Sequence, residues 1–191
     1  MEVVPNGVEE IFLQRKEDST RADHLVTTVT ITPRKRVLEL VKAAALAQIK
    51  VKIIGKPYNE KDPYYLRFLD EVKRSQPWVE YQGAITDRGQ LAAEYRKAKG
   101  FVLLSAMESQ SLSALEAAAC GCPLLLSDLP WARVSFGSQA SYCPLAGARP
   151  TASFLRSFWK NADRAPIPSG ILSWRQVAQK LASIYRDLIA A

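Results

Sequence analysis

Two glutamates, Glu108 and Glu116, are separated by seven residues in a segment that could do chemistry. Glu108 lies in a polar stretch after an apolar run, and Glu116 lies in the short helix that we expect over residues 113–120. At a helix start, free backbone N–H groups and the positive end of the helix dipole attract anions. A carboxylate can also accept hydrogen bonds from two neighbouring hydroxyl groups. The segment therefore predicts a phosphate or nucleotide site, with one glutamate for sugar hydroxyls and the other for a ribose diol.

The same residues have a purely structural interpretation. Ser113 and Glu116 have the spacing of a capping box, in which the glutamate hydrogen-bonds back to the helix start. In that case Glu116 would stabilise the helix and bind no ligand. The residues by themselves thus indicate an anion site of unknown purpose.

Strand and helix patterns alternate along the chain, and they decide where these glutamates must lie. Apolar, β-branched runs bounded by turn residues predict strands, at residues 24–31, 51–54, 78–81, 101–104, 123–126 and 140–143. Apolar residues at helical spacing predict helices between them, at residues 37–45, 63–73, 90–98 and 113–120. This order predicts an α/β fold, a Rossmann-like parallel sheet with helices on both faces. Ligands of such sheets bind beyond the carboxyl ends of the strands, where both glutamates fall.

We expect three parts along the 191 residues. Residues 1–22 form a lead-in with a turn at Asn6-Gly7, and this turn has no earlier strand to pair with, which predicts a piece of a longer protein. Residues 23–147 form the Rossmann-like core. Residues 148–191 carry further helices, the last from residue 173, whose periodic apolar residues predict packing on the core.

Charge and composition narrow the partners. Twenty-six basic and nineteen acidic residues give a net charge of +7, which suits nucleotide phosphates, nucleic acid or an anionic membrane surface. The basic residues are scattered, and we find no aromatic–basic RNA-binding motif. The three cysteines predict small buried thiols and a reducing compartment rather than a disulfide framework. We see no signal peptide and no apolar run long enough to span a membrane, so we expect a cytoplasmic protein whose membrane contact, if any, is peripheral at the inner face.

A resemblance gives the glutamates a more specific meaning. Glu108, Glu116 and the tail Ala117–Pro123 resemble the E-x7-E signature of the glycosyl transferases group 1, family four. Its members are retaining glycosyltransferases with the two-lobed GT-B fold. Pro5–Val8 resembles the interdomain linker of this family, so the resemblance covers nearly the whole chain but one of the two lobes. It implies the C-terminal lobe, which binds the nucleotide-sugar donor.

The resemblance also implies a role for each site residue. Glu108 matches the glutamate that contacts the donor sugar, and Lys35 matches the lysine that stabilises the leaving diphosphate, so these two are the implied catalytic residues. Glu116 matches the glutamate that holds the ribose hydroxyls. The other implied substrate-binding residues contact the diphosphate, the sugar or the base: Arg34, Ser111, Leu112, Gln110, Gly55, Gly83 and Ala84.

Two departures from the family pattern fall in the implied site. Thr30 stands where the family usually has an arginine, and Ser109–Ser111 replaces the usual Gly-Phe-Gly. Arg34–Arg36 forms a basic turn at a helix start, where cations oppose the helix dipole. This turn is either solvated or bound to an anion, and its unfavourable position favours the anion.

Taken together, the resemblance implies transfer of a hexose, with retention, from a nucleoside-diphosphate sugar to a carbohydrate or lipid-linked acceptor bound by a second lobe. UDP-sugar is favoured over GDP-sugar, bacterial polysaccharide synthesis is plausible by analogy, and the isolated lobe is expected to bind donor and transfer it poorly. We expect no cofactor and no metal, because no Asp-x-Asp motif or ligand cluster is present. Alternatives are a nucleotide-sugar epimerase of the same fold, a lobe that binds nucleotide sugar as a regulator, and a basic nucleic-acid-binding module.

Overall fold

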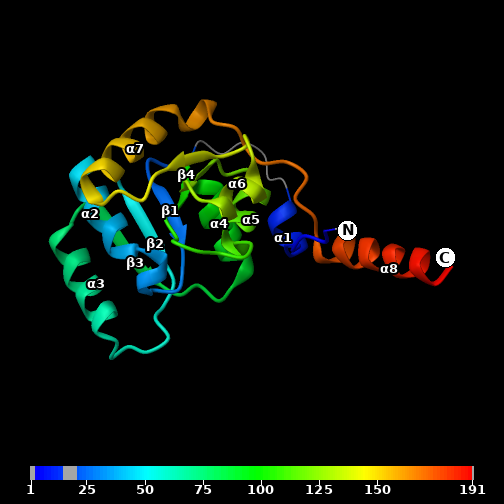
Figure 1. Ribbon diagram of the computed structural model, residues 1–191. Helices are drawn as coiled ribbons and strands as arrows, with labels where there is room; N and C mark the ends of the chain where they lie inside the picture. Colours follow the sequence, from blue (N-terminus) through cyan, green and yellow to red (C-terminus); the bar gives the residue numbers. More distant parts are fainter. Residues whose placement is uncertain (1–2, 15–20, 191) are drawn as a thin grey trace.

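The computed structural model describes residues 3–14 and 21–190 and contains a six-stranded parallel sheet between two groups of helices (Figure 1). The strand order is β3-β2-β1-β4-β5-β6, and every neighbouring pair is parallel. The strands are β1 (Leu25–Thr28), β2 (Val51–Ile54), β3 (Val79–Gly83), β4 (Gly100–Leu103), β5 (Leu124–Ser127) and β6 (Ser141–Cys143). The predicted α/β fold is confirmed.

The apolar sequences of the central strands follow from their cover by helices. All residues of β4 and β5 are buried, as expected for parallel strands that carry helices on both faces. One group of helices packs together as α3, α2 and α7, and another as α1, α4 and α5. The helices are α1 (Glu10–Leu13), α2 (Val37–Ala47), α3 (Pro63–Arg74), α4 (Arg88–Lys97), α5 (Leu112–Ala119), α6 (Pro130–Phe136), α7 (Ala148–Asn161) and α8 (Trp174–Ala190).

The first strand is shorter than its sequence predicts. β1 ends at Thr28, whereas the β-branched run continues to Ile31. The Val29 and Ile31 N–H groups still donate to the carbonyls of Ile54 and Lys56, at 2.9 and 3.0 Å. Residues 29–31 therefore continue beside the end of β2 and form a wall at the carboxyl edge of the sheet.

The lead-in belongs to the folded body and lies beside the start of α8. The Val8 N–H donates to the Leu172 carbonyl at 2.9 Å, and the Trp174 N–H donates to the Val8 carbonyl at 3.1 Å. Phe12 on α1 is completely buried. Of the predicted 1–22 segment, residues 1–2 and 15–20 lie outside the described residues.

The last two helices differ in their packing. α7 packs along α2 and buries Leu155 and Phe158. α8 projects away from the sheet (Figure 1), and beyond Val177 its apolar residues Leu181 and Leu188 are exposed. The expectation that this helix packs on the core is therefore correct only for its first turn, because periodicity marks an apolar face without saying what covers it.

Hydropathy sets one further limit on the fold. Over the described residues, every helix is too short or too polar to cross a membrane.

Candidate functional site

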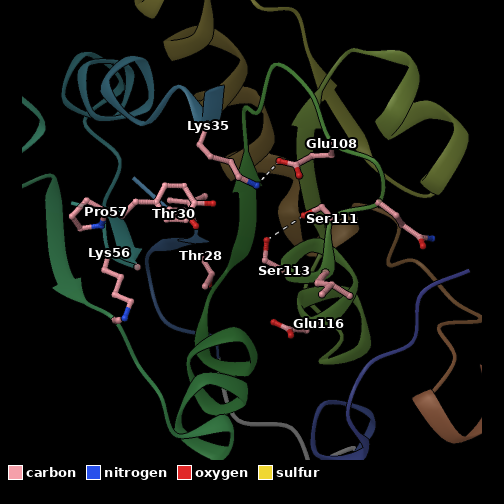
Figure 2. A pocket seen from close by; sticks show the side chains of 15 residues that line it. Thr28, Thr30, Lys35, Lys56, Pro57, Glu108, Ser111, Ser113 and Glu116 are labelled. Atoms are coloured by element: carbon pink, nitrogen blue, oxygen red, sulfur yellow. Dashed lines mark hydrogen bonds and ion pairs between the residues drawn. The ribbon is translucent and has the colours of Figure 1, made fainter. Parts of the chain in front are cut away.

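The site lies at the carboxyl edge of the sheet, where the strand order reverses between β1 and β4. Loops that leave the sheet on either side of such a reversal open a crevice between them. Here the loops after β1, β2, β3 and β4 surround a cavity of about 490 Å³ (Figure 2). This volume falls in the range of small-molecule sites. The topology therefore places a ligand-sized cavity where the sequence predicted one.

Lys35 and Glu108 face each other across the top of this cavity (Figure 2). Lys35 ends a short 3-10 turn, Pro33–Lys35, after β1, and Glu108 lies in the loop after β4. The Lys35 ammonium donates a hydrogen bond to Glu108 Oε1, and Arg34 Nη1 lies 3.4 Å from Glu108 Oε2. The side chains of Lys35 and Glu108 are only 11% and 10% exposed. The structure thus joins two predicted catalytic residues in one partly buried ion pair.

The charges around Glu108 keep it ionised. Burial by itself raises the pKa of Glu108, but hydrogen bonds from Lys35 and Ser105 and the charges of Lys35 and Arg34 act more strongly in the opposite direction. The pKa of this carboxyl group is therefore below its ordinary value. Glu108 is a carboxylate at neutral pH and presents a negative charge to the cavity.

The start of α5 forms another wall of the cavity. Ser111 is the N-cap of this helix, and its Oγ accepts a hydrogen bond from the Ala114 N–H at 3.3 Å. Leu112 is the first helical residue, so its N–H group has no partner within the helix. The cavity is lined by Ser111, Leu112 and Gln110, three of the predicted substrate-binding residues.

Glu116 does not cap the helix. Its carboxylate accepts hydrogen bonds from Arg88 on Oε1 and from the Tyr95 hydroxyl on Oε2, the latter at 3.3 Å. Glu116 lines the same cavity, and the residue is 8% exposed. Burial raises the pKa of Glu116, and the opposing hydrogen bond and charge of Arg88 do not fully offset this effect. The capping-box interpretation is wrong, because the side chain is directed to α4 and the cavity.

The predicted glycines have mainly a backbone role. A Cβ atom at Gly55 would lie 1.7 Å from the Val29 carbonyl oxygen, so only glycine fits beside the end of β1. The Gly55 N–H donates to the Gly83 carbonyl at 2.8 Å, which joins the ends of β2 and β3. Gly55 and Ala84 line the cavity. Gly83 and Arg34 lie next to lining residues, while the lining itself includes neither of them.

Several contributors were not predicted from the sequence. Lys56, in the loop after β2, lines the cavity opposite α5, and Thr28 at the end of β1 lines it as well (Figure 2). Tyr58 in the same loop as Lys56 is also part of the lining. Lys56 directly follows Gly55, a predicted site residue, so its position in the sequence could have identified it as part of the site. Arg88 is the first residue of α4, where a cation opposes the helix dipole, and the same signal drew attention to Arg34–Arg36.

The remaining chemically interesting side chains are structural. Cys122 and Cys143 are buried and Cys120 is half-buried, and all three are free thiols, as predicted. Burial raises the pKa of Cys120 and of Cys122 to about 12, so neither is a reactive thiolate. Among residues 3–14 and 21–190, no group of three histidine, cysteine or carboxylate side chains lies together as a metal site.

Comparison with known proteins places this site in a family. The sequence profile described as Glycosyl transferases group 1 matches residues 10–141, which include the cavity. No curated protein sequence matches the chain. Among solved structures, the C-terminal domain of the group 1 glycosyl transferase LpcC from Francisella tularensis has a TM-score of 0.69 at 17% identity, and the match covers 82% of this chain and 90% of that one.

Longer proteins match the same fold. The pneumococcal O-GlcNAc transferase GtfA, solved with UDP and GlcNAc, has a TM-score of 0.73 at 15% identity and covers 97% of this chain and 39% of its own. Anabaena Alr3699/HepE, solved with UDP and glucose, has a TM-score of 0.76 at 17% identity, with 97% and 56% covered. The chain thus spans about half or less of these two proteins, and it has the fold of the C-terminal lobe of GT-B glycosyltransferases. Because the profile covers more than half of its residues, this chain belongs to the glycosyl transferases group 1 family.

Proposed function

We propose that this chain is the donor-binding lobe of a retaining glycosyltransferase and that a nucleoside-diphosphate sugar binds in the cavity at the β1–β4 reversal. The Lys35–Glu108 pair carries the proposal, because it presents one cation and one carboxylate to a ligand-sized cavity beside the start of α5. Two proteins of the same fold, GtfA and HepE, were solved with UDP. Their ligand supports UDP as the first nucleotide to test.

The diphosphate is expected between Lys35 and the first turn of α5. When the bond to the sugar breaks, the leaving diphosphate gains negative charge. The Lys35 ammonium, the Leu112 N–H and the positive end of the helix dipole would stabilise that charge as it forms. Arg34, which lies 3.4 Å from Glu108, adds a second cation at the rim.

The transferred hexose is expected beside Glu108 and Gln110. A sugar that loses its leaving group develops positive, oxocarbenium-like charge, and a carboxylate nearby stabilises it. Glu108 is suited to this role because its depressed pKa keeps it ionised. The rest of the donor extends past Gly55 and Ala84, where backbone groups are available to the base, and Glu116 accepts hydrogen bonds from the ribose hydroxyls.

The complete reaction requires more than this lobe. In our proposal the acceptor, a carbohydrate or lipid-linked sugar, binds to a second lobe, and the enzyme acts in the cytoplasm or at the inner face of the membrane. The isolated chain then binds donor but transfers it poorly. The polysaccharide pathway is proposed only by analogy with other retaining enzymes of this kind.

Calorimetric titration of the chain with UDP, GDP, ADP and their sugar nucleotides tests the donor site. We expect micromolar to millimolar binding of one diphosphate, with a dissociation constant at least tenfold higher for Glu116→Gln. Arg74→Met is the matched control, because Arg74 forms an exposed pair with Asp70 on α3, outside the cavity. If none of the nucleotides binds, or if Glu116→Gln binds like the wild type, the proposed donor site is wrong.

Salt dependence separates the donor site from a nucleic-acid-binding surface. A polynucleotide neutralised by many basic residues releases many counterions, so its affinity falls steeply with salt. A single diphosphate should lose much less affinity between 50 and 200 mM salt, roughly a few-fold. Tight, steeply salt-dependent binding of a single-stranded oligonucleotide would favour the alternative.

A further inference from the structure

Arg88 connects the proposed ribose carboxylate to the lead-in of the chain. Its guanidinium donates to Glu116 Oε1, and its Nε donates to Glu9 Oε1 at 2.7 Å. The Arg88 guanidinium also lies 4.7 Å from the centre of the Phe12 ring. One cation therefore contacts α5, the residue before α1 and α1 itself. Arg88 therefore interacts with two carboxylates and with the face of one aromatic ring.

The position of Arg88 is unfavourable unless these partners are present. Asp87 caps α4, and Arg88 is the first residue of that helix, where the dipole repels a cation. Burial also disfavours the charged guanidinium, but the hydrogen bonds and charges of Glu116 and Glu9 act more strongly and raise the pKa of Arg88. The Arg88 side chain is 39% exposed, so Coulomb attraction between the charges is partly screened by water. The contacts of Arg88 with Glu116 and Glu9 therefore contribute more to the orientation of these side chains than to the stability of the fold.

Tyr95 completes the frame around Glu116. Arg88 and Tyr95 are two helical turns apart on α4, and both face α5. Tyr95 is fully buried and hydrogen-bonds to Glu116 Oε2 at 3.3 Å. Burial raises the pKa of Tyr95 well above its ordinary value, so its hydroxyl remains a donor. The Glu116 carboxylate is thus held by one donor on each oxygen.

This arrangement leaves a matched pair of acceptor positions. An ionised carboxylate offers about four lone-pair sites, two on each oxygen. With Arg88 on Oε1 and Tyr95 on Oε2, about one site remains on each oxygen. Two neighbouring hydroxyl groups can each donate to one of them.

We propose that Arg88 is a positioning residue, which orients the Glu116 carboxylate to accept both hydroxyl groups of a ribose diol, with Glu9 as the anchor that holds the guanidinium. The proposal rests on the donor site described under Proposed function and adds to it a specificity for the intact diol. It also makes Glu9, in the lead-in, part of the donor site's support. α1 is fixed to α4 independently, since Arg96 donates to the Ile11 carbonyl at 2.5 Å.

A ligand that lacks the ribose hydroxyls distinguishes a positioning role of Arg88 from a general effect of Arg88 on the stability of the protein. The nucleoside diphosphate among UDP, GDP and ADP that the wild type binds most tightly is titrated beside its 2′,3′-dideoxy analogue. Hydrogen bonds to a charged group predict that the wild type prefers the intact diol by about 10- to 100-fold. We expect Arg88→Met to reduce this preference to within about threefold, mainly by weakening the binding of the intact ligand. Arg88→Lys should restore part of it, and the control Arg74→Met should change nothing.

Substitution of Glu9, the anchor of Arg88, provides a second variant with a smaller expected effect. Glu9→Gln keeps the shape of the side chain and removes the charge that holds the Arg88 Nε. We expect a preference for the intact diol between those of the wild type and Arg88→Met. If Arg88→Met does not fold, as judged by circular dichroism and thermal unfolding, Glu9→Gln and Arg88→Lys carry the test.

The pH profile supplies a readout that a structural role would not move. The groups facing Glu116 are Arg88 and Tyr95 from α4, Glu9 before α1, and Cys120 at the C-cap of α5. Only the ionised Glu116 can accept both hydroxyls, so affinity should fall as the pH is lowered through its pKa. The Arg88 cation lowers the pKa of Glu116, so this pKa should rise in Arg88→Met. The affinity of the variant should therefore begin to fall at a higher pH than that of the wild type.

The outcomes distinguish this inference from the proposed function. If Glu116→Gln loses the preference for the diol while Arg88→Met keeps the preference and pH profile of the wild type, Arg88 does not position Glu116 and the inference is overturned. If Glu116→Gln itself keeps the wild-type preference, or if the wild type binds none of the three diphosphates, the donor site is wrong and the inference falls with it.

Discussion

Individual residues of the cavity are already paired in the structure, and the phosphate and hydroxyl groups of a ligand would meet these pairs in different ways. The Lys35 ammonium is hydrogen-bonded to Glu108, and the Glu116 carboxylate is hydrogen-bonded to Arg88 and Tyr95. A diphosphate would replace the carboxylate as the partner of Lys35, whereas a diol would use acceptor positions that Glu116 still offers. Phosphate binding and hydroxyl binding therefore depend on different residues and can be tested separately.

Lys35→Met should weaken the binding of phosphates selectively. A charge-assisted hydrogen bond to a phosphate is lost, so the dissociation constant of the bound nucleoside diphosphate should rise by about 10- to 100-fold. The parent nucleoside, which has no phosphate, should bind with the same affinity as before. Calorimetric titration of both ligands on both proteins measures the difference. An equal loss for the nucleoside would show that the substitution had disturbed the whole cavity.

Lys56→Met tests a cation that the sequence comparison overlooked. Thr30 and Lys56 both line the cavity, and Thr30 is the position at which the family resemblance implied an arginine. We expect the substitution to raise the dissociation constant of the diphosphate by about three- to tenfold, less than Lys35→Met, because Lys56 is exposed and screened. The control is Lys61→Met on the same loop, which does not line the cavity. Equal effects of the two variants would mean that only net charge matters.

The ionisation of Glu108 should be visible in the pH dependence of stability. Its pKa in the folded chain is below the ordinary value of 4.5, so the ionised group stabilises the fold above that pH. This contribution is lost as the pH falls through the lowered pKa. The contribution of Glu116 to stability depends on pH in the opposite direction, because its pKa is raised in the folded chain. Glu116 stabilises the fold at acidic pH, and this contribution is lost as the pH rises through the raised pKa.

Urea unfolding of the wild type and Glu108→Gln from pH 3 to pH 7 measures this contribution. The free energy of unfolding should be lower for Glu108→Gln at neutral pH, and the two proteins should converge as the pH falls below about 4.5. A difference that is constant over the whole range would show that the Glu108 charge is not stabilised in the fold.

The sequence predicted these residues unequally, for physical reasons. Glu108, Glu116 and Lys35 follow strands, so the topology of a parallel sheet brings them to one edge. Arg88 contacts Glu116 only because α4 and α5 pack side by side, and no local pattern encodes that packing. The one local sign of Arg88 is its unfavourable position in the first turn of α4.

Among the helices, the long ones were predictable and the two shortest, α1 and α6, were not. α2 and α3 contain three turns of periodic apolar residues, which identify a helix. α1 has four residues and α6 has seven, too few to establish a period. Isolated segments of this length do not hold a helix, so burial of Phe12 and Phe136 must stabilise them. Their existence depends on tertiary packing.

Two glycines at strand ends should differ in their tolerance of alanine. A Cβ atom at Gly55 would meet the Val29 carbonyl oxygen at 1.7 Å, whereas one at Gly83 would meet nothing within 4 Å. At Gly83, with φ of +77°, alanine costs only the strain of a left-handed backbone, about 1–2 kcal/mol. Gly55→Ala must also displace the end of β1, and we expect it to lower the free energy of unfolding by about 3 kcal/mol or more. Chemical denaturation measures both variants, and equal losses would contradict the close approach of Gly55 and Val29.

For the whole molecule, the arrangement of the chain ends goes beyond what the sequence could predict. The turn expected at Asn6-Gly7 does not form, since neither residue has a positive φ. The segment instead contacts the start of α8, which joins residues more than 160 positions apart along the chain, as in the Val8–Leu172 hydrogen bond. The apolar period of α8 was expected as well. It predicted a covered face, whereas the structure leaves most of that face exposed.

The exposed half of α8 should therefore contribute little to the stability of this chain. Leu188 is 68% exposed, whereas Val177 on the first turns of the same helix is 8% exposed. Surface substitutions usually change the free energy of unfolding by less than about 0.5 kcal/mol, so Leu188→Ser should be nearly neutral. Val177→Ala removes buried apolar groups and should cost about 1–3 kcal/mol. Differential scanning calorimetry of the two variants compares them directly. If Leu188→Ser lowered the melting temperature as much as Val177→Ala, the far half of α8 would have to pack against the body of the protein in solution.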